Sequence, residues 1–247
     1  MIKLNLPEKP EELTDEVERQ LMAEYKADKK PVWRKSYIID SLLKMSNNKC
    51  AFSEQELNSQ SAYMEVEHFK PKSLYEDEVV RWGNLLPVCK KCNDTKGDWD
   101  VNQRPIVNPL IDYPCNHLFV RSFRFYKKDE KGQNTIDAVA LNDRNHFVTV
   151  RSEIGFRIAD DLEECFENLK NALHNPIKER RTLNRIKNRL KDCGSKKPYS
   201  AVLSTYILYE VPVYREMEQF LKEIYLWDDE FQEIKENLLF CALPEPE

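Results

Sequence analysis

Two short stretches, VEHFKPKS (66–73) and NLLPVCKKCNDTKGD (84–98), hold most of the chemically informative residues of this chain. The first places His68, one of only four histidines, directly after Glu67 and shortly before a proline. The informative side chains of the second stretch are Asn84, Cys89, Cys92 and Asn93. Three interpretations are open: a metal-dependent active site, a zinc-binding knuckle, or a buried histidine near two thiols.

The residues around His68 have the chemistry that hydrolysis needs. Histidine is a natural general base, because its ordinary pKa lies close to neutrality. Glu67 and Asn93 supply hard oxygen ligands of the kind that Mg²⁺ or Mn²⁺ prefers. In a strand over residues 65–69, neighbouring side chains point to opposite faces, so both can serve one centre only where the strand ends. Pro71 predicts such an end just after His68.

The composition is that of a globular protein. The 247 residues are 41% hydrophobic and 33% charged, which allows a sizeable core. Five glycines argue against a Gly-rich phosphate loop and favour a helix-rich protein. The first residues lack the apolar core of a signal peptide, and no run approaches the length of a membrane span, so we expect a cytoplasmic protein without membrane contact. Seven scattered cysteines fit a reducing compartment.

The hydrophobic pattern divides the chain into three segments and predicts an α+β, predominantly helical fold. Residues 1–45 show the spacing of two helices. Residues 46–105 are irregular and hold the motif residues. Residues 106–247 begin with a predicted β-hairpin, made of strands at 118–126 and 135–141, and continue as a helical region.

Charge is distributed unevenly along the predicted C-terminal helices. The net charge is −5, but residues 170–197 hold ten Lys and Arg against two acids, and residues 201–247 hold three against eleven. Asn175 and Pro176 predict the start of a helix in the basic region. Three arginines at every fourth position form one stripe on this helix: Arg181, Arg185 and Arg189. The stripe is either a solvated face or a set of phosphate contacts, since residues 46–105 hold eight basic residues against ten acids.

The motif residues resemble those of the HNH endonucleases, which carry a ββα-metal finger. The matching residues are, in order, Cys50, Glu67, His68, Asn84, Cys89, Cys92, Asn93, Lys96 and Gly97. Residues 106–120, the predicted hairpin and residues 140–153 extend the likeness to the PtuB-type HNH nucleases. The fold implied by this resemblance is an α+β protein built around one HNH finger over residues 46–105.

The resemblance implies a role for each motif residue. His68 would be the general base that polarises water, and Asn84, in the loop between the two strands, would hold the His68 backbone. Glu67, in place of the more usual aspartate, and Asn93 would bind one Mg²⁺ or Mn²⁺ ion. Lys96 would lie near a phosphate. The implied activity is metal-dependent hydrolysis of phosphodiester bonds in DNA, or in an RNA such as tRNA.

The resemblance also implies partners. PtuB-type nucleases work in bacterial anti-phage defence beside an ABC-type ATPase, PtuA, in Septu systems and in some retron systems. We therefore expect nucleic acid as substrate, such an ATPase as partner and, in a retron setting, a reverse transcriptase with its DNA–RNA hybrid. The alternative is a non-cutting subunit that binds nucleic acid or serves assembly. A site that had ceased to cut should have lost its base or its ligands, and His68, Glu67 and Asn93 are all present.

Related fingers carry two Cys-x-x-Cys pairs, and this chain departs from that pattern. Cys89 and Cys92 form the second pair, but the first reads Cys50-Ala-Phe-Ser53. Three thiols remain, whereas a structural zinc site normally has four ligands. Either another side chain completes a structural Zn²⁺ site, or the finger relies on packing without zinc.

Overall fold

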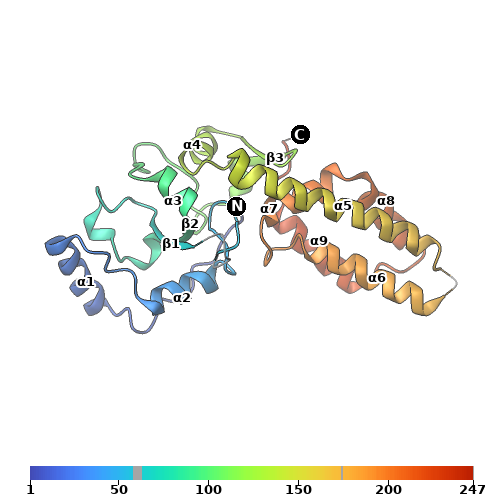
Figure 1. Ribbon diagram of the computed structural model, residues 1–247, viewed down its shortest axis with the longest axis horizontal. Coiled ribbons are helices and arrows are strands. Elements are labelled where there is room, and N and C mark those ends of the chain that lie inside the picture. Colours follow the sequence, from blue (N-terminus) through green and yellow to red (C-terminus); the bar gives the residue numbers. More distant parts are fainter. Residues whose placement is uncertain (58–62, 174, 247) are drawn as a thin grey trace. The chain divides into compact units, whose positions relative to one another are not determined.

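The protein is α+β and predominantly helical, as the sequence predicts (Figure 1). The computed structural model describes residues 1–57, 63–173 and 175–246. Internal contacts divide the chain into two compact units. Unit 1 comprises Met1–Leu118 and Lys127–Leu141, and unit 2 comprises Phe119–Tyr126 and Asn142–Glu247.

Unit 1 combines two N-terminal helices with a small two-stranded sheet. Its helices and strands are α1 (Asp15–Asp28), α2 (Ser36–Met45), β1 (Met64–His68), β2 (Leu85–Cys89), α3 (Lys90–Lys96) and α4 (Glu130–Ala138). Short 3-10 turns occur at Glu76–Glu78, Trp82–Asn84 and Pro114–Asn116. Thr14 caps α1 by accepting a hydrogen bond from the Val17 amide, as expected for a helix start at this threonine. The two helices predicted within residues 1–45 are thereby confirmed.

The sheet of unit 1 pairs β1 with β2 in antiparallel orientation. Met64 lies opposite Cys89, and His68 lies opposite Leu85. All five residues of β2 are buried, which fits the continuous apolar run Leu85–Cys89. Helix α3 begins at the residue after β2, so the two strands and α3 form a compact ββα unit.

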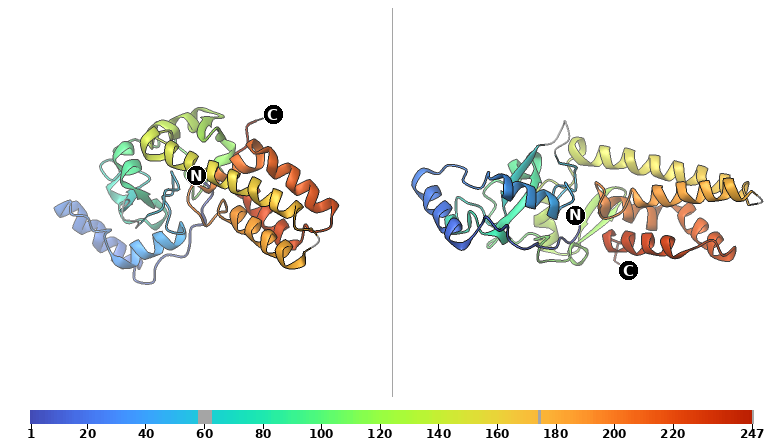
Figure 2. Two further views of the ribbon diagram at one scale, coloured as in Figure 1. Left: turned by 45° about the vertical axis from the view of Figure 1, so that its right-hand side comes forward. Right: turned by 90° about the horizontal axis from the view of Figure 1, so that it is seen from below.

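Unit 2 is a bundle of helices around its own core. Its helices are α5 (Thr149–Lys170), α6 (Pro176–Lys191), α7 (Ser200–Thr205), α8 (Pro212–Glu223) and α9 (Asp229–Cys241). Single π-helical turns lie at Arg144–Val148 and Tyr206–Glu210. The long helices α5 and α6 pack side by side (Figure 2). Asn175 caps α6 by accepting from the Lys178 amide at 3.1 Å, which confirms the predicted helix start.

The predicted hairpin is wrong in its second strand. The hairpin consists of β3 (Leu118–Arg121) and β4 (Arg124–Lys127), and residues 135–141 lie mostly in helix α4. Ser122 and Phe123 have φ values of 47° and 62°, so a two-residue turn divides the stretch that the sequence suggested was one strand. Asp129 then caps α4 by accepting from the Gly132 amide at 2.8 Å.

Gly132 in the first turn of α4 has a steric reason to be glycine. A Cβ at this position would lie 2.0 Å from the His117 carbonyl oxygen, far inside any allowed contact. The close approach lets α4 begin directly against the chain segment that precedes β3, which a larger residue would prevent.

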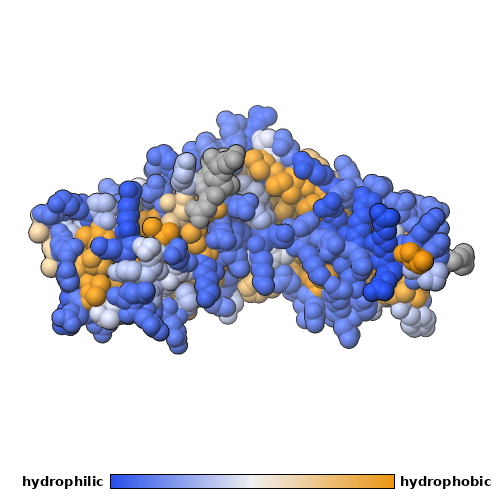
Figure 3. Space-filling view, turned by 60° about the horizontal axis from the view of Figure 1, so that its bottom comes forward, coloured by the Kyte–Doolittle hydropathy of each residue, from blue (hydrophilic) through white to orange (hydrophobic). Residues whose placement is uncertain are grey.

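Hydrophilic side chains predominate on the face shown in Figure 3, and hydrophobic side chains form separate patches between them. The most exposed large apolar side chains of the described residues are Tyr225, Ile177, Tyr63 and Ile111. None of the helices in the described ranges is both long enough and apolar enough to cross a lipid bilayer.

Candidate active site and thiol cluster

His68 is the last residue of β1, where the strand ends as Pro71 predicted. Its side chain is buried, with 3% of its surface exposed. Its Nε2 lies 2.9 Å from the Val79 carbonyl oxygen, and the edge of its ring meets Trp33 with centroids 4.5 Å apart. A carbonyl oxygen only accepts, so Nε2 carries the proton and Nδ1 keeps the lone pair of the neutral ring.

Burial lowers the pKa of His68 from 6.5 to about 4, and the hydrogen bond to Val79 only partly offsets this effect. The histidine is therefore neutral at physiological pH. A neutral imidazole whose second nitrogen is fixed as a donor is the form that can take a proton from water at Nδ1.

Asn84 fixes the chain immediately after His68. Its Oδ1 accepts from the Lys70 amide at 2.7 Å, and its Nδ2 donates to the Lys70 and Glu78 carbonyl oxygens at 3.2 and 3.0 Å. Its own carbonyl accepts from the Phe69 amide at 2.9 Å. The structure thus places Asn84 as a clamp on the backbone at Phe69 and Lys70, close to the role predicted at His68.

Lys96 does not lie where the sequence suggested. The ammonium group, expected near a phosphate, is buried and lies 2.5 Å from Glu67 Oε1 and 2.9 Å from the His68 carbonyl oxygen. The Lys96 side chain thereby ties α3 to the end of β1. Because it is enclosed by its own fold, Lys96 is part of the frame of the site.

Glu67 is buried together with Lys96, with 5% of its surface exposed. Burial raises the pKa of Glu67, and the charge and hydrogen bond of Lys96 oppose that rise. The ion pair holds the carboxylate in one orientation beside His68. Glu67 and His68 both line the same pocket, so the strand end does bring neighbouring residues to one centre.

The pocket has a volume of about 220 Å³. Its lining residues are Glu67, His68, Pro71, Lys72, Asn93, Asp94, Gly97 and Asp98. The predicted ligands Glu67 and Asn93 therefore face one space, and Asp94 and Asp98 add two carboxylates that the sequence analysis missed. The two aspartates lie four positions apart around the end of α3, and this spacing is the sequence signal that could have identified them. Carboxylate and amide oxygens are the donors that a hard divalent cation such as Mg²⁺ or Mn²⁺ prefers. Among the described residues, the carboxylates and the histidine of the pocket are not gathered as closely as the three thiols described next.

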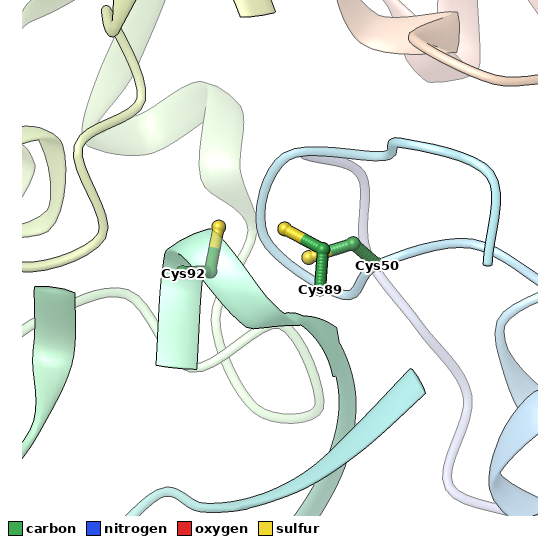
Figure 4. Close-up of side chains that lie close together, drawn as sticks. All are labelled: Cys50, Cys89 and Cys92. Carbon is green, nitrogen blue, oxygen red and sulfur yellow. The ribbon is translucent and has the colours of Figure 1, made fainter. Parts of the chain in front are cut away.

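The three thiols of the motif form one buried cluster (Figure 4). Cys50 comes from a loop, Cys89 ends β2, and Cys92 lies in the first turn of α3. Their sulfur atoms all lie within 4.8 Å of one another. Tetrahedral zinc with bonds of about 2.3 Å sets sulfurs about 3.8 Å apart, so small side-chain adjustments fit the cluster to Zn²⁺.

Ser53 occupies the place of the missing fourth cysteine. Its Oγ lies 3.6 Å from Cys89 Sγ, and its amide donates to Cys50 Sγ at 3.5 Å. Burial raises the pKa of Cys92, whereas hydrogen bonds from the neighbouring thiols, acting against burial, hold the pKa of Cys50 well below its usual value. The cluster thus favours one thiolate, with a hydroxyl close enough to join the set.

The arginine stripe on α6 is largely neutralised. Arg185 Nη1 lies 3.1 Å from Glu164 Oε1, and Arg189 Nε lies 2.7 Å from Asp161 Oδ2, so both arginines join α6 to α5. Arg181 lines a shallow hollow with Lys178 near the start of α6. Of the three arginines of the stripe, Arg181 alone has no carboxylate within ion-pair distance among the described residues.

The fold and the site define an α+β protein whose ββα unit gathers a buried histidine, oxygen donors and a thiol cluster. The chain is 36% identical over 250 residues to Septu protein PtuB of Bacillus thuringiensis, with 100% of this chain and 96% of the relative covered. It is also 27% identical over 155 residues to Septu protein PtuB of Bacillus mycoides (strain KBAB4), covering 49% of this chain and 50% of that relative. No protein-family model and no solved structure matches. The chain belongs to the Septu PtuB family.

Proposed function

We propose that this protein is a metal-dependent endonuclease of the HNH type that acts in Septu anti-phage defence. The observation that carries the proposal is the neutral His68, whose Nε2–H is committed to Val79 and whose side chain lines a pocket of oxygen donors. Membership of the Septu PtuB family supports the defence role. The ββα arrangement and the motif residues support the HNH type.

In this mechanism His68 Nδ1 takes a proton from the water that attacks the phosphorus. The Val79 carbonyl holds the imidazole through Nε2–H and stabilises the positive charge that forms. Asn84 keeps the chain beyond β1 in place, and Trp33 restricts the tilt of the ring. Burial disfavours the protonated ring, so the negative charge of substrate and pocket carboxylates has to offset that cost during the reaction.

Glu67 and Asn93 would hold a single Mg²⁺ or Mn²⁺ ion, with Asp94 and Asp98 within the same pocket. Such a cation stabilises the leaving oxygen of a phosphodiester. Lys96 orients Glu67 through their ion pair, so one carboxylate oxygen is fixed before any cation binds.

The thiol cluster would hold a structural Zn²⁺, with Cys50, Cys89 and Cys92 as ligands and the Ser53 hydroxyl beside them. Cys92 and Asn93 are neighbours on α3, so a metal at the thiols would fix the first turn of the helix that carries a ligand of the pocket. Zinc content near one ion per chain in wild-type protein, lost in Cys92→Ser, would support this role. A zinc-free protein with the same stability as Cys92→Ser would contradict it.

The proposed substrate is nucleic acid, with DNA placed before RNA, and the proposed partner is an ABC-type ATPase of the PtuA kind. In a retron setting the complex would include the reverse transcriptase with its DNA–RNA hybrid. The ion pairs of Arg185 and Arg189 reduce the cationic surface of α6, which leaves Arg181, the pocket itself and a partner as the means of holding a polyanion.

The test is incubation of the purified protein, alone and with its co-expressed ATPase, with plasmid DNA and with total RNA. Each substrate is offered in Mg²⁺, in Mn²⁺ and in EDTA. We expect metal-dependent cutting that His68→Ala abolishes and that His146→Ala, an exposed histidine of unit 2, retains. Undiminished cutting by His68→Ala, or none by the wild-type complex, would refute the proposed activity and leave the binding or assembly alternative.

A further inference from the structure

The pocket needs a cation that can reach substrate, and Lys96 does not supply it. The Lys96 ammonium is enclosed between Glu67 and the His68 carbonyl oxygen. Of the residues that line the pocket, Lys72 alone carries a positive charge, and it is exposed. Within the described residues no carboxylate oxygen lies within 4.0 Å of its ammonium group, so an anion from outside can take that place.

Trp33 gives Lys72 a defined position beside the candidate base. The Lys72 ammonium lies over the Trp33 ring, 5.7 Å from its centroid, and the same ring meets His68 at 4.5 Å. Trp33 is itself 8% exposed and packs against Tyr25 in the core of unit 1. A cation held on a buried indole loses less conformational freedom on binding an anion than a lysine on an open surface.

The charges around the pocket favour a side-chain cation in addition to a bound metal ion. Asp94 and Asp98 contribute negative charge at the exposed rim, and Lys96 already balances Glu67 from inside. A phosphodiester that approaches His68 therefore meets two carboxylates. Lys72 is the lining group that can offset their repulsion by pairing with a non-bridging phosphate oxygen.

We propose that Lys72 binds a non-bridging oxygen of the substrate phosphate next to His68, with Trp33 as the residue that positions it. The expected effect of Lys72 on the cutting rate rests on the proposed nuclease function. Its contact with a phosphate does not. Lys72 is thus the substrate-binding cation of the site, the role that the motif suggested for Lys96.

The experiment compares wild type with Lys72→Met, Lys72→Arg and Lys35→Met. Lys35 is the matched control, because it is an exposed lysine of the same unit. Single-turnover cutting with excess enzyme measures the rate. Binding of a fluorescein-labelled DNA duplex and a labelled single-stranded RNA is measured by anisotropy over a range of salt, in a His68→Ala background that leaves the probe intact.

We expect Lys72→Met to slow cutting roughly 10²-fold, with partial recovery in Lys72→Arg and little change in Lys35→Met. The slope of log affinity against log salt should fall by about 0.9 for the duplex or about 0.7 for the single strand. Thermal unfolding should match wild type, since the side chain is exposed.

The two readouts separate the two proposals. If wild type cuts neither polymer but Lys72→Met still lowers the salt slope, the nuclease function fails and the Lys72 phosphate contact stands. If wild type cuts and Lys72→Met changes neither the rate nor the slope relative to Lys35→Met, the Lys72 contact is refuted and the nuclease function stands. Absence of probe binding by every variant also refutes the contact.

Discussion

Two lysines, one in each unit, perform the same task in different surroundings. Lys96 on α3 binds Glu67, and both side chains are enclosed, with 0% and 6% of their surfaces exposed. Lys187 on α6 is nearly as buried, at 8%, but its partners Asp228 and Glu230 are 55% and 45% exposed. From this comparison we expect the exposure of the acid, more than that of the lysine, to decide what an ion pair contributes to stability.

Water can fully solvate the carboxylates of unit 2 when the lysine is removed, whereas Glu67 in unit 1 is 6% exposed and meets water only where it lines the pocket. The Lys96–Glu67 pair of unit 1 should therefore contribute more to stability than the ion pairs of Lys187 in unit 2. Three measurements test this difference.

Lys96→Met should have the largest effect. It leaves the Glu67 carboxylate buried without its partner, which costs roughly 3–5 kcal/mol of the free energy of unfolding of unit 1. The measurement is urea unfolding followed by tryptophan fluorescence, which reports chiefly on unit 1 because Trp33, Trp82 and Trp99 lie there. The double variant Lys96→Met/Glu67→Gln should recover part of the loss. Equal losses in the single and double variants would show that the buried charge is not the cause.

Acidification should destabilise the metal-free protein through His68. The pKa of His68 is about 4 in the folded state against 6.5 ordinarily, so the unfolded chain binds more protons between these values. The free energy of unfolding should therefore fall as the pH drops from 6.5 to 4, by up to roughly 3 kcal/mol from this group.

Burial raises the pKa of Glu67, so above the ordinary pKa of a glutamate this group makes stability change with pH in the opposite direction. The contribution of His68 is therefore obtained as the difference between wild type and a variant without it. Urea unfolding in EDTA at several pH values, for wild type and His68→Asn, provides that difference. The variant should lose stability less steeply in acid. Parallel curves would mean that the histidine is not desolvated as the structure indicates.

Lys187→Met should have the smallest effect. Burial lowers the pKa of Lys187, but its hydrogen bonds to Asp228 and Glu230 outweigh burial and raise the pKa overall. Both acids nevertheless stay hydrated when the lysine is removed. Methionine also keeps an apolar side chain against the Phe231 ring. We expect a clearly smaller loss than for Lys96→Met, and high salt should reduce the difference from wild type. Hydrogen exchange of α6 and α9 peptides would measure this loss of stability. A loss as large as that for Lys96→Met would contradict the comparison.

The parts of the fold that the sequence predicted correctly depend on neighbouring residues. Thr14 and Asn175 bond to amides three positions away, so the starts of α1 and α6 could be inferred from short stretches. The strand end at His68 follows in the same way from the nearby Pro71. The candidate pocket was largely anticipated because its residues fall in two short segments.

The errors arose where distant residues decide. The turn at Ser122 and Phe123 contains no glycine or asparagine, and both residues adopt positive φ. The Ser122 amide is bound by the Glu210 carboxylate, 88 positions away, and Phe123 packs against Phe156 and Tyr206. No local pattern indicates such support, so residues 118–126 were predicted as a single strand of the hairpin and not as β3, a turn and β4.

The inward position of the Lys96 ammonium group was not foreseen for a related reason. Its partners lie on β1, 28 and 29 positions earlier, and a lysine next to a glycine at a helix end resembles a phosphate contact equally well. Only the antiparallel register and the packing of α3 show that its ammonium group faces inward. Sequence spacing gives the order of such residues but not the direction of each side chain.

The Asn84 clamp has a consequence for how this family can diverge. Between the two strands, the backbone of residues 71–83 forms local turns, such as those from Tyr75 to Pro71 and from Arg81 to Glu78. The tie to the end of β1 comes from the Asn84 side chain, its own carbonyl and the Val79 carbonyl that meets the His68 ring. Relatives could therefore vary the exposed turns of that connection over generations, provided that the asparagine and the carbonyl that holds the histidine stay in place.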